Sequence, residues 1–94
     1  MFVLVLTYTK PLEEVDALMR DHMAWLKAGY RDGHFVVSGR QIPRTGGVIL
    51  ARGDDLEETE ALAASDPFVS GGVATVEIVQ FRASQSVPGF DALL

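Results

Sequence analysis

The chain has 94 residues, of which 48% are hydrophobic and 22% charged, and its 13 acidic and 8 basic side chains give a net charge of −5. This length allows one domain with one core, and the composition is that of a globular protein. The negative charge argues against a nucleic-acid-binding surface, no apolar run approaches the roughly 20 residues that cross a bilayer, and the absence of cysteine excludes disulfides and thiolate metal sites.

The N-terminal half of the chain predicts a strand, a helix and a second strand. Residues 1–6 carry neither a basic leader nor a small-residue cleavage site, so we expect a cytoplasmic protein. Residues 2–8 form an apolar run of strand length. A proline, two glutamates and apolar side chains at helical spacing predict a helix over 11–28, which Gly29 would end. After an Asp-Gly turn, residues 34–38 predict the second strand.

The C-terminal half predicts two more strands around a second helix. A loop with glycines and arginines, residues 39–46, leads into a strand over 47–52. Asp55 followed three residues later by a glutamate resembles a capping box. It predicts a helix over 56–65 that the following Asp-Pro pair would end, because the residue before a proline avoids helical geometry. Residues 73–82 predict the fourth and longest strand.

The resulting order of strand, helix, strand, strand, helix, strand indicates an α+β fold. Because crossovers between parallel strands are right-handed, this order is typical of a ferredoxin-like β-α-β-β-α-β plait. Such a plait is an antiparallel four-stranded sheet with two helices on one face. We expect a single domain over residues 1–94, with its core in residues 1–82 and a tail with an apolar end over residues 83–94.

The two strands that this topology places at the centre of the sheet are apolar on both faces, over residues 2–6 and 48–51. An antiparallel sheet with one face in water should instead alternate apolar and polar side chains. Because a large exposed apolar patch is unusual on a monomer, we expect the open face to pack on a second copy of the chain through a two-fold axis. The alternative is a monomer whose tail folds over its own sheet.

His22 stands in the apolar stripe of the first helix, where a leucine or valine would be expected. It could be a histidine at the edge of the core, or a general base, which needs a carboxylate at its other ring nitrogen. Asp66 could supply this carboxylate. The two helices of the plait run antiparallel, and a rise of about 1.5 Å per residue brings both residues within roughly 6 Å of each other along the axis. Asp66 could equally serve only the turn that ends its helix.

The loop after the second strand supplies polar side chains that could hold a ligand. The topology places this loop on the side of the second helix, so Ser38, Arg40 and Arg44 could bind a small anionic molecule, although loop arginines are often only solvated. The loop glycines form no phosphate-binding motif. His34 is the one further candidate metal ligand near His22 and Asp66. Because it opens a strand after a turn, we expect it to be solvated, and we therefore expect neither a metal nor a cofactor.

Several short segments stand in a distinctive order along the chain: His22-Met23-Ala24-Trp25-Leu26, the Gly33 turn, Asp66-Pro67-Phe68 with a glycine pair nearby, and Val79-Gln80-Phe81-Arg82. Together they resemble the YciI-like (YCII-related) family of the dimeric α+β barrel group. The resemblance implies a homodimer with a cleft that holds a His–Asp pair suspected of acid–base work, here His22 and Asp66. This chain has Gly39-Arg40 where the family often has Gly-Pro.

These features predict a cofactor-free enzyme that moves protons on a small anionic or ring-bearing metabolite, in an elimination or isomerisation of the kind that the resemblance implies. His22 would act as general base and then as acid, while Asp66 would fix its tautomer. Ser38 with Arg40 or Arg44 would hold the substrate. The alternatives are a dimer that binds a small ligand without chemistry or serves as an accessory subunit, and a purely structural dimer with a closed cleft.

Overall fold

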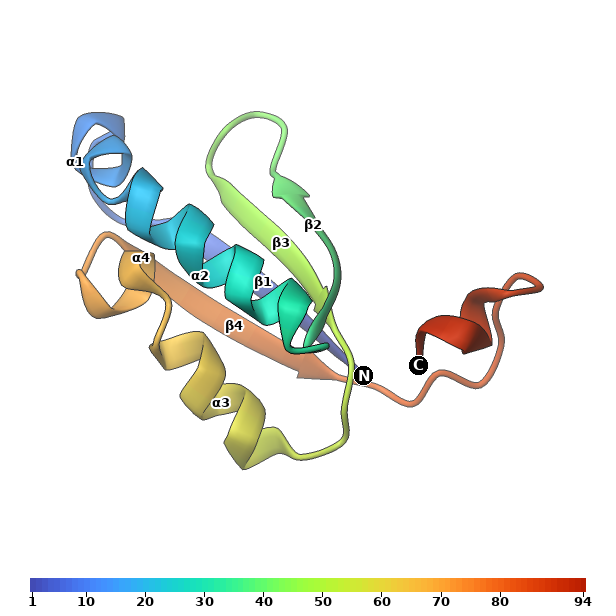
Figure 1. The fold of residues 1–94 in the computed structure, drawn as a ribbon. Coiled ribbons are helices and arrows are strands. Elements are labelled where there is room, and N and C mark those ends of the chain that lie inside the picture. The colour runs from blue at the N-terminus through green and yellow to red at the C-terminus, as the bar shows by residue number, and fades with distance from the viewer.

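The structure is a computed structural model that describes all 94 residues. Its main elements follow the predicted order, but the first predicted helix is present as two helices and a further short helix follows the second (Figure 1). In chain order the elements are β1 (Phe2–Tyr8), α1 (Leu12–Ala17), α2 (Met19–Arg31), β2 (Phe35–Arg40), β3 (Gly46–Ala51), α3 (Leu56–Ala64), α4 (Pro67–Ser70), β4 (Ala74–Gln80) and the 3-10 helix η1 (Phe90–Leu93).

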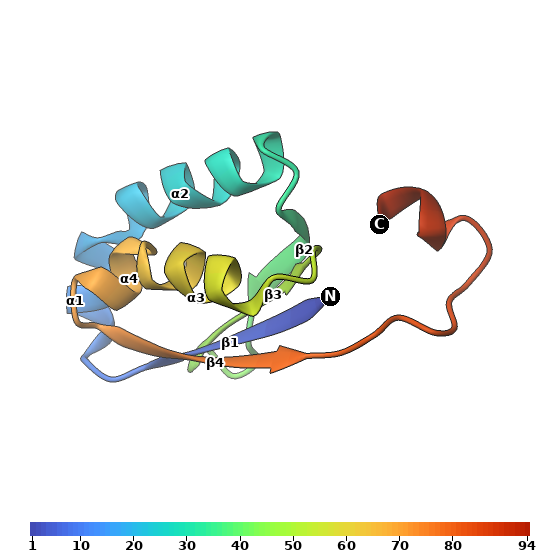
Figure 2. The ribbon, with the colours of Figure 1, turned by 90° about the horizontal axis from the view of Figure 1, so that it is seen from below.

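The four strands form one sheet in the order β2-β3-β1-β4, and every neighbouring pair is antiparallel. The four α-helices all lie on one face of this sheet and leave the other face open (Figure 2). β1 and β3 occupy the two central positions, as expected for right-handed crossovers in this element order. The predicted plait is therefore confirmed.

The first helical segment differs from its prediction at both its middle and its end. Leu18 leaves helical geometry (φ −103°, ψ 1°) and so divides the segment into α1 and α2. Gly29 was expected to end the helix, but α2 continues to Arg31. A Cβ atom at Gly29 would lie only 2.1 Å from the ring of Phe35. This glycine therefore serves close helix–sheet packing rather than helix termination.

The helix predicted over 56–65 is α3, which ends just before Asp66, as the Asp-Pro pair predicts. The residue does more than end α3, however. Its side chain accepts a hydrogen bond from the Phe68 backbone N–H and so caps the short helix α4, whose first residue is a proline. The cap predicted at Asp55 is confirmed, because its carboxylate accepts from the Glu58 N–H at 3.1 Å.

The core lies between the helices and the sheet. Phe2, Leu4 and Leu6 of β1 are buried on the helix side, and burial of each such side chain contributes about 1.5–3 kcal/mol to stability. Successive strand residues point to opposite faces, so Val3 and Val5 point to the open face. The residues packed most closely around β1 are Leu26, Phe35, Ile49, Ala51 and Ala63.

The open face of the sheet carries an apolar row, as the two-sided apolar pattern of the central strands predicted. Val37, Leu50, Val3 and Val79 stand opposite one another in the strand registers and form a row across all four strands. Val37 is 57% exposed and Val79 45%. We call this row the open-face row.

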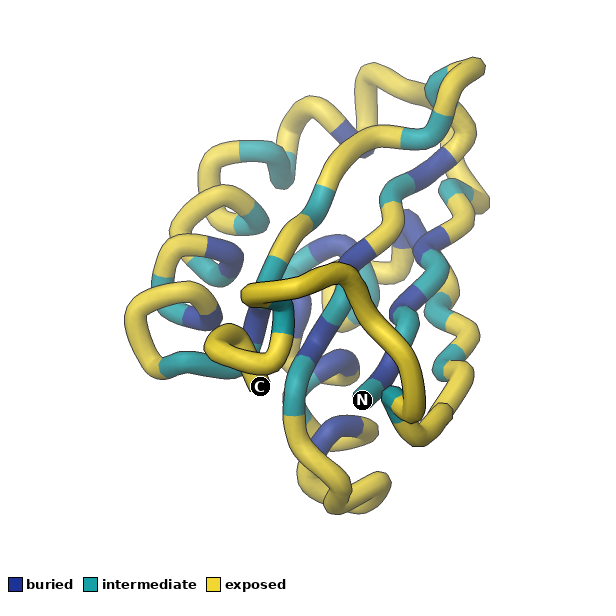
Figure 3. The backbone as a smooth tube through the Cα atoms, turned by 90° about the vertical axis from the view of Figure 1, so that its right-hand side faces the viewer, coloured by how far each residue is buried: buried dark blue, intermediate teal, exposed yellow.

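Residues 83–94 extend beyond the end of the sheet and carry η1 (Figures 2 and 3). Most of the tail is exposed, including Val87 at 71%, and its backbone hydrogen bonds join residues of the tail to one another. The tail therefore does not cover the open face of its own sheet. No helix in the structure is both long and apolar enough to cross a membrane.

Candidate functional site

A cleft of about 210 Å³ lies on the helix side of the sheet, between α2 and the strands β3 and β2. Gly47 helps to form it, because this residue lacks a side chain where its strand neighbours Leu6 and Arg40 have theirs. Eight of the lining residues are hydrophobic. The lining comprises Leu6, Tyr8, Met19, His22, Met23, Leu26, Ser38, Gly39, Arg40, Gly46, Gly47, Val48, Ile49 and Phe68.

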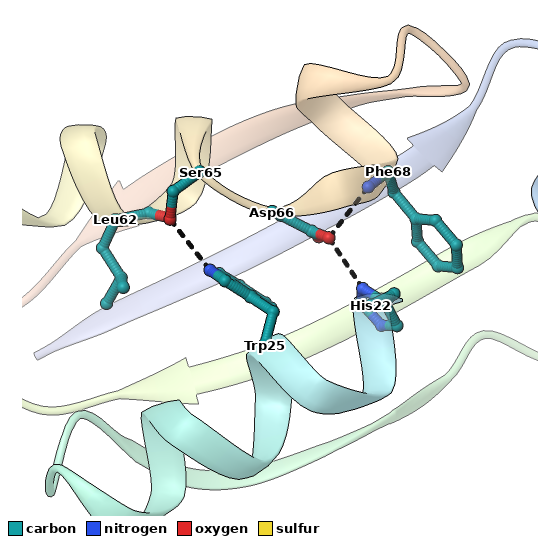
Figure 4. A network of polar contacts seen from close by, with 6 residues as sticks. All are labelled: His22, Trp25, Leu62, Ser65, Asp66 and Phe68. Atoms are coloured by element: carbon teal, nitrogen blue, oxygen red, sulfur yellow. Dashed lines mark hydrogen bonds and ion pairs between the residues drawn. The ribbon is translucent and has the colours of Figure 1, made fainter. Parts of the chain in front are cut away.

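His22 lines this cleft from α2, and its ring contacts Asp66. The Nδ1 atom lies 2.7 Å from Asp66 Oδ1 (Figure 4). The His22 side chain is 12% exposed and the Asp66 side chain is fully buried. The contact expected from helix spacing is therefore present.

The chemistry of this contact assigns the histidine tautomer. An ionised carboxylate can only accept hydrogen bonds, so Nδ1 carries the ring proton and the Nδ1–H group donates a hydrogen bond to Asp66. In the neutral ring the other nitrogen, Nε2, then keeps its lone pair. A histidine held in this way can take up a proton at Nε2, because the carboxylate stabilises the imidazolium that forms.

Asp66 is held in place by the helix that it caps. Its Oδ1 atom accepts from both the Phe68 N–H, at 3.0 Å, and the His22 ring. A buried carboxylate without such partners would be strongly destabilising. The second oxygen, Oδ2, is buried and has no hydrogen-bond partner. All the polar contacts of the carboxylate thus lie on the oxygen that faces the histidine.

Aromatic side chains fix the plane of the His22 ring. Phe68 stacks on it with ring centroids 3.9 Å apart and planes 9° apart, and Trp25 stacks more loosely at 5.8 Å. The Trp25 indole is held by its Nε1–H, which donates to Ser65 Oγ at 2.9 Å, and Ser65 donates in turn to the Leu62 carbonyl (Figure 4). The orientation of the imidazole is therefore set by a hydrogen bond and by packing.

Two of the three predicted ligand-binding residues lie at the cleft. Ser38 and Arg40 of β2 are part of its lining. The Ser38 hydroxyl shares a 2.6 Å hydrogen bond with the Tyr30 hydroxyl of α2. Arg40 forms no ion pair, so its charge is available to a ligand.

Arg44 lies outside the lining of the cleft. Its guanidinium donates to Asp16 Oδ1 of α1 at 2.6 Å and packs against the Tyr8 ring. His34 lies in a separate hollow beside Arg52 and Asp54, away from His22. No group of three or more potential metal-ligating side chains gathers in the structure.

Sequence reasoning missed four side chains of the cleft: Tyr8, Met19, Met23 and Phe68. Tyr8 was taken as part of an apolar strand, although its polar tip at the strand end was a usable signal. Met19 and Met23 are spaced by one helical turn from each other and flank His22 on the same face of α2, which helical periodicity could have shown. Phe68 was noted only as part of the Asp66-Pro67-Phe68 segment, because its place in the cleft depends on the turn at Asp66.

Comparison with protein families identifies the chain: the model of the YCII-related domain matches residues 1–82. The chain belongs to the YCII-related family. The resemblance read from the sequence is thus confirmed, and the match ends where the tail begins. None of the curated proteins matches this YCII-related chain.

A solved structure with a similar fold is 5-chloro-2-hydroxyhydroquinone dehydrochlorinase (TftG) from Burkholderia phenoliruptrix AC1100, in complex with 2,5-dihydroxybenzoquinone. The two share 17% sequence identity with a TM-score of 0.71, over 87% of this chain and 94% of that chain. At this identity the likeness concerns the fold. The YCII-related chain therefore shares its ferredoxin-like plait with this structure, as the sequence predicted.

Proposed function

We propose that this YCII-related protein is a cofactor-free acid–base enzyme in which His22 and Asp66 move protons on a small ring-bearing or anionic metabolite. One observation carries the proposal. The imidazole of His22 lines a cleft and makes a 2.7 Å contact from Nδ1 to a fully buried carboxylate. This arrangement is that of a general base with an orienting carboxylate.

In the proposed reaction, Nε2 of His22 removes a proton from the substrate. The electron pair left behind either forms a new double bond while a leaving group departs with the pair of its own broken bond, or moves into a neighbouring carbonyl to give an enolate. The imidazolium then returns its proton to the leaving group or to a second substrate atom, which completes an elimination or an isomerisation. Asp66 stabilises the imidazolium between the two transfers and fixes the ring.

Features of the cleft support a small anionic or ring-shaped substrate. Its volume of about 210 Å³ suits a single substituted ring, and its walls are mostly apolar. Arg40 is the free cation of the lining, and with Ser38 it would hold a carboxylate or phenolate oxygen. The enzyme with the similar fold acts on a chlorinated hydroxyhydroquinone and was solved with a quinone. A planar quinone or phenol is therefore the first class to test.

The protein is also proposed to work as a homodimer in the cytoplasm. The open-face row presents four aliphatic side chains across the whole sheet, and no helix or tail of the same chain covers them. A two-fold contact between two such faces would remove this surface from water in both copies.

The test is the exchange of the ring protons of a quinone for deuterium. 2,5-Dihydroxybenzoquinone in D₂O exchanges its ring C–H protons for deuterium when a base and an acid act on the ring, and NMR follows the loss of the proton signal. We expect the wild-type protein to accelerate this exchange. His22→Ala should lower the protein-catalysed rate by about 10²–10⁴-fold, the usual contribution of a general base. Its elution volume in gel filtration should equal that of the wild type.

His22→Gln separates this proposal from the alternative of a binding module. Glutamine can donate a hydrogen bond to Asp66 but cannot take up a proton near neutral pH. If exchange is as fast in His22→Gln and in His22→Ala as in the wild type, the proposed acid–base activity is wrong. If the wild type binds the quinone without accelerating exchange, and His22→Gln binds it equally well, the protein is a ligand-binding module.

A further inference from the structure

Tyr8 lines the cleft, yet the reaction proposed above does not use it. Its ring meets Phe68 edge-on, with centroids 5.8 Å apart and planes at 88°, and Phe68 stacks on His22. One aromatic ring therefore separates Tyr8 from the proposed base. The backbone of Tyr8 is anchored as well, because its N–H donates to the Thr45 carbonyl at 2.9 Å.

Arg44 packs beside Tyr8 and is itself held by Asp16. Its Cζ atom lies 5.9 Å from the centroid of the Tyr8 ring, within the range of a cation–π contact. Its Nη2 atom donates to Asp16 Oδ1 at 2.6 Å. This hydrogen bond raises the pKa of Arg44 above its usual value, and the neighbouring Tyr8 hydroxyl contributes to the increase. The guanidinium is thus fixed between α1, the β2–β3 loop and the end of β1.

The charge of Arg44 determines what the Tyr8 hydroxyl can do. A guanidinium only donates hydrogen bonds, so toward Arg44 the phenol oxygen can only be an acceptor. The phenol proton then stays available to another acceptor. The nearby positive charge also makes the phenol a better donor, because it stabilises the negative charge that builds up on the oxygen when the proton is shared.

We infer that Tyr8 contacts the ligand by donating a hydrogen bond to an enolate, phenolate or carboxylate oxygen, and that Arg44 is a positioning residue that acts through Tyr8. The inference rests on the proposed function, since it takes the cleft as the ligand site. It also refines the ligand class. With Arg40 available for one oxygen and Tyr8 for another, the cleft should prefer a ring that carries two oxygen groups over a ring that carries one.

The experiment is a double-mutant cycle on the affinity for 2,5-dihydroxybenzoquinone. Loss of one hydrogen bond in Tyr8→Phe should raise Kd about tenfold, and Arg44→Gln should raise it several-fold. The double variant should bind no more weakly than Tyr8→Phe alone, because Arg44 has no route to the ligand other than Tyr8. Arg31→Gln is the matched control, since Arg31 pairs with Asp32 on the exposed surface at 3.1 Å.

A spectroscopic readout accompanies the cycle. The chain has two tyrosines, and the quinone should shift the ring signals of Tyr8 in NMR spectra of the wild type, with a smaller shift in Arg44→Gln. Additive losses in Kd, or a bound quinone that leaves the Tyr8 signals unmoved, would overturn the inference while leaving the proposed function intact. The same cycle on unfolding free energies needs no ligand, and independent effects of the two substitutions there would overturn the role of Arg44. A wild-type protein that binds no quinone would contradict the proposed ligand class itself.

Discussion

His22 Nδ1 and Asp66 Oδ1 lie 2.7 Å apart, although 44 positions separate the two residues in the chain. The contact joins α2 to the turn between α3 and α4. It depends on two local features, the cap that Asp66 gives to α4 and the ring of Phe68 that stacks on the imidazole. The same turn therefore supplies the carboxylate that orients the proposed base and the aromatic surface that supports it.

Asp66→Asn should destabilise the protein by about 1–3 kcal/mol, the cost of a buried polar group left without a partner. The amide oxygen could keep both hydrogen bonds of Oδ1, but the NH₂ group would then take the place of Oδ2, which has no protein partner. Urea denaturation measures this loss. Asp55→Asn is the matched control, because Asp55 also caps a helix but is exposed. Equal stability of wild type and Asp66→Asn would contradict the packing described for the carboxylate.

Gly47→Ala should narrow the cleft and weaken the binding of 2,5-dihydroxybenzoquinone several-fold. The added methyl group would point to the helix side, where the neighbouring Leu6 and Arg40 side chains lie, and its nearest contact would be the Gly39 carbonyl oxygen at 3.2 Å. Gly39 also belongs to the lining, but Gly39→Ala is the control, because strand alternation directs its methyl group to the open face, where it meets no atom within 4 Å. Titration calorimetry on both variants measures the difference. Equal affinities of the two variants for the quinone would indicate that the ligand binds outside this cleft.

Val3→Lys should convert the proposed dimer into monomers. Val3 stands at a central position of the open-face row, between Leu50 and Val79, so pairing would bury an ammonium group among aliphatic side chains. Light scattering after gel filtration measures the mass. Leu56→Lys, which places the same charge on an exposed apolar residue of the helix layer, should leave the mass unchanged. A wild-type mass of one chain would contradict the dimer.

The sequence was sufficient for the topology and for placing His22 and Asp66 at the same level along the helix axes. Both follow from regular spacing, since strand and helix lengths determine which residues stand opposite one another across the plait. Gly29 was misread because glycine ends helices as often as it permits close packing, and only the position of the Phe35 ring distinguishes the two roles.

Irregular backbone limited the prediction of the cleft. Arg40 was expected in the loop, but β2 extends through this residue, and strand alternation directs it to the same side as Ser38, where both line the cleft. Arg44 lies in the loop four residues later, where no periodicity gives a direction, and it pairs with Asp16 of α1 instead. Tyr8 and Phe68 were missed for the related reason that they lie at the end of an element or after a turn.

The most direct test of the account is the tautomer of His22, measured from ¹⁵N chemical shifts of the imidazole at a pH where the ring is neutral. The contact with Asp66 predicts a proton on Nδ1 and a bare Nε2 available to accept a proton from a ligand. A ring that carries its proton on Nε2 would contradict the account. The nitrogen facing Asp66 would then have no proton to donate to the carboxylate, and the proposed base would be blocked.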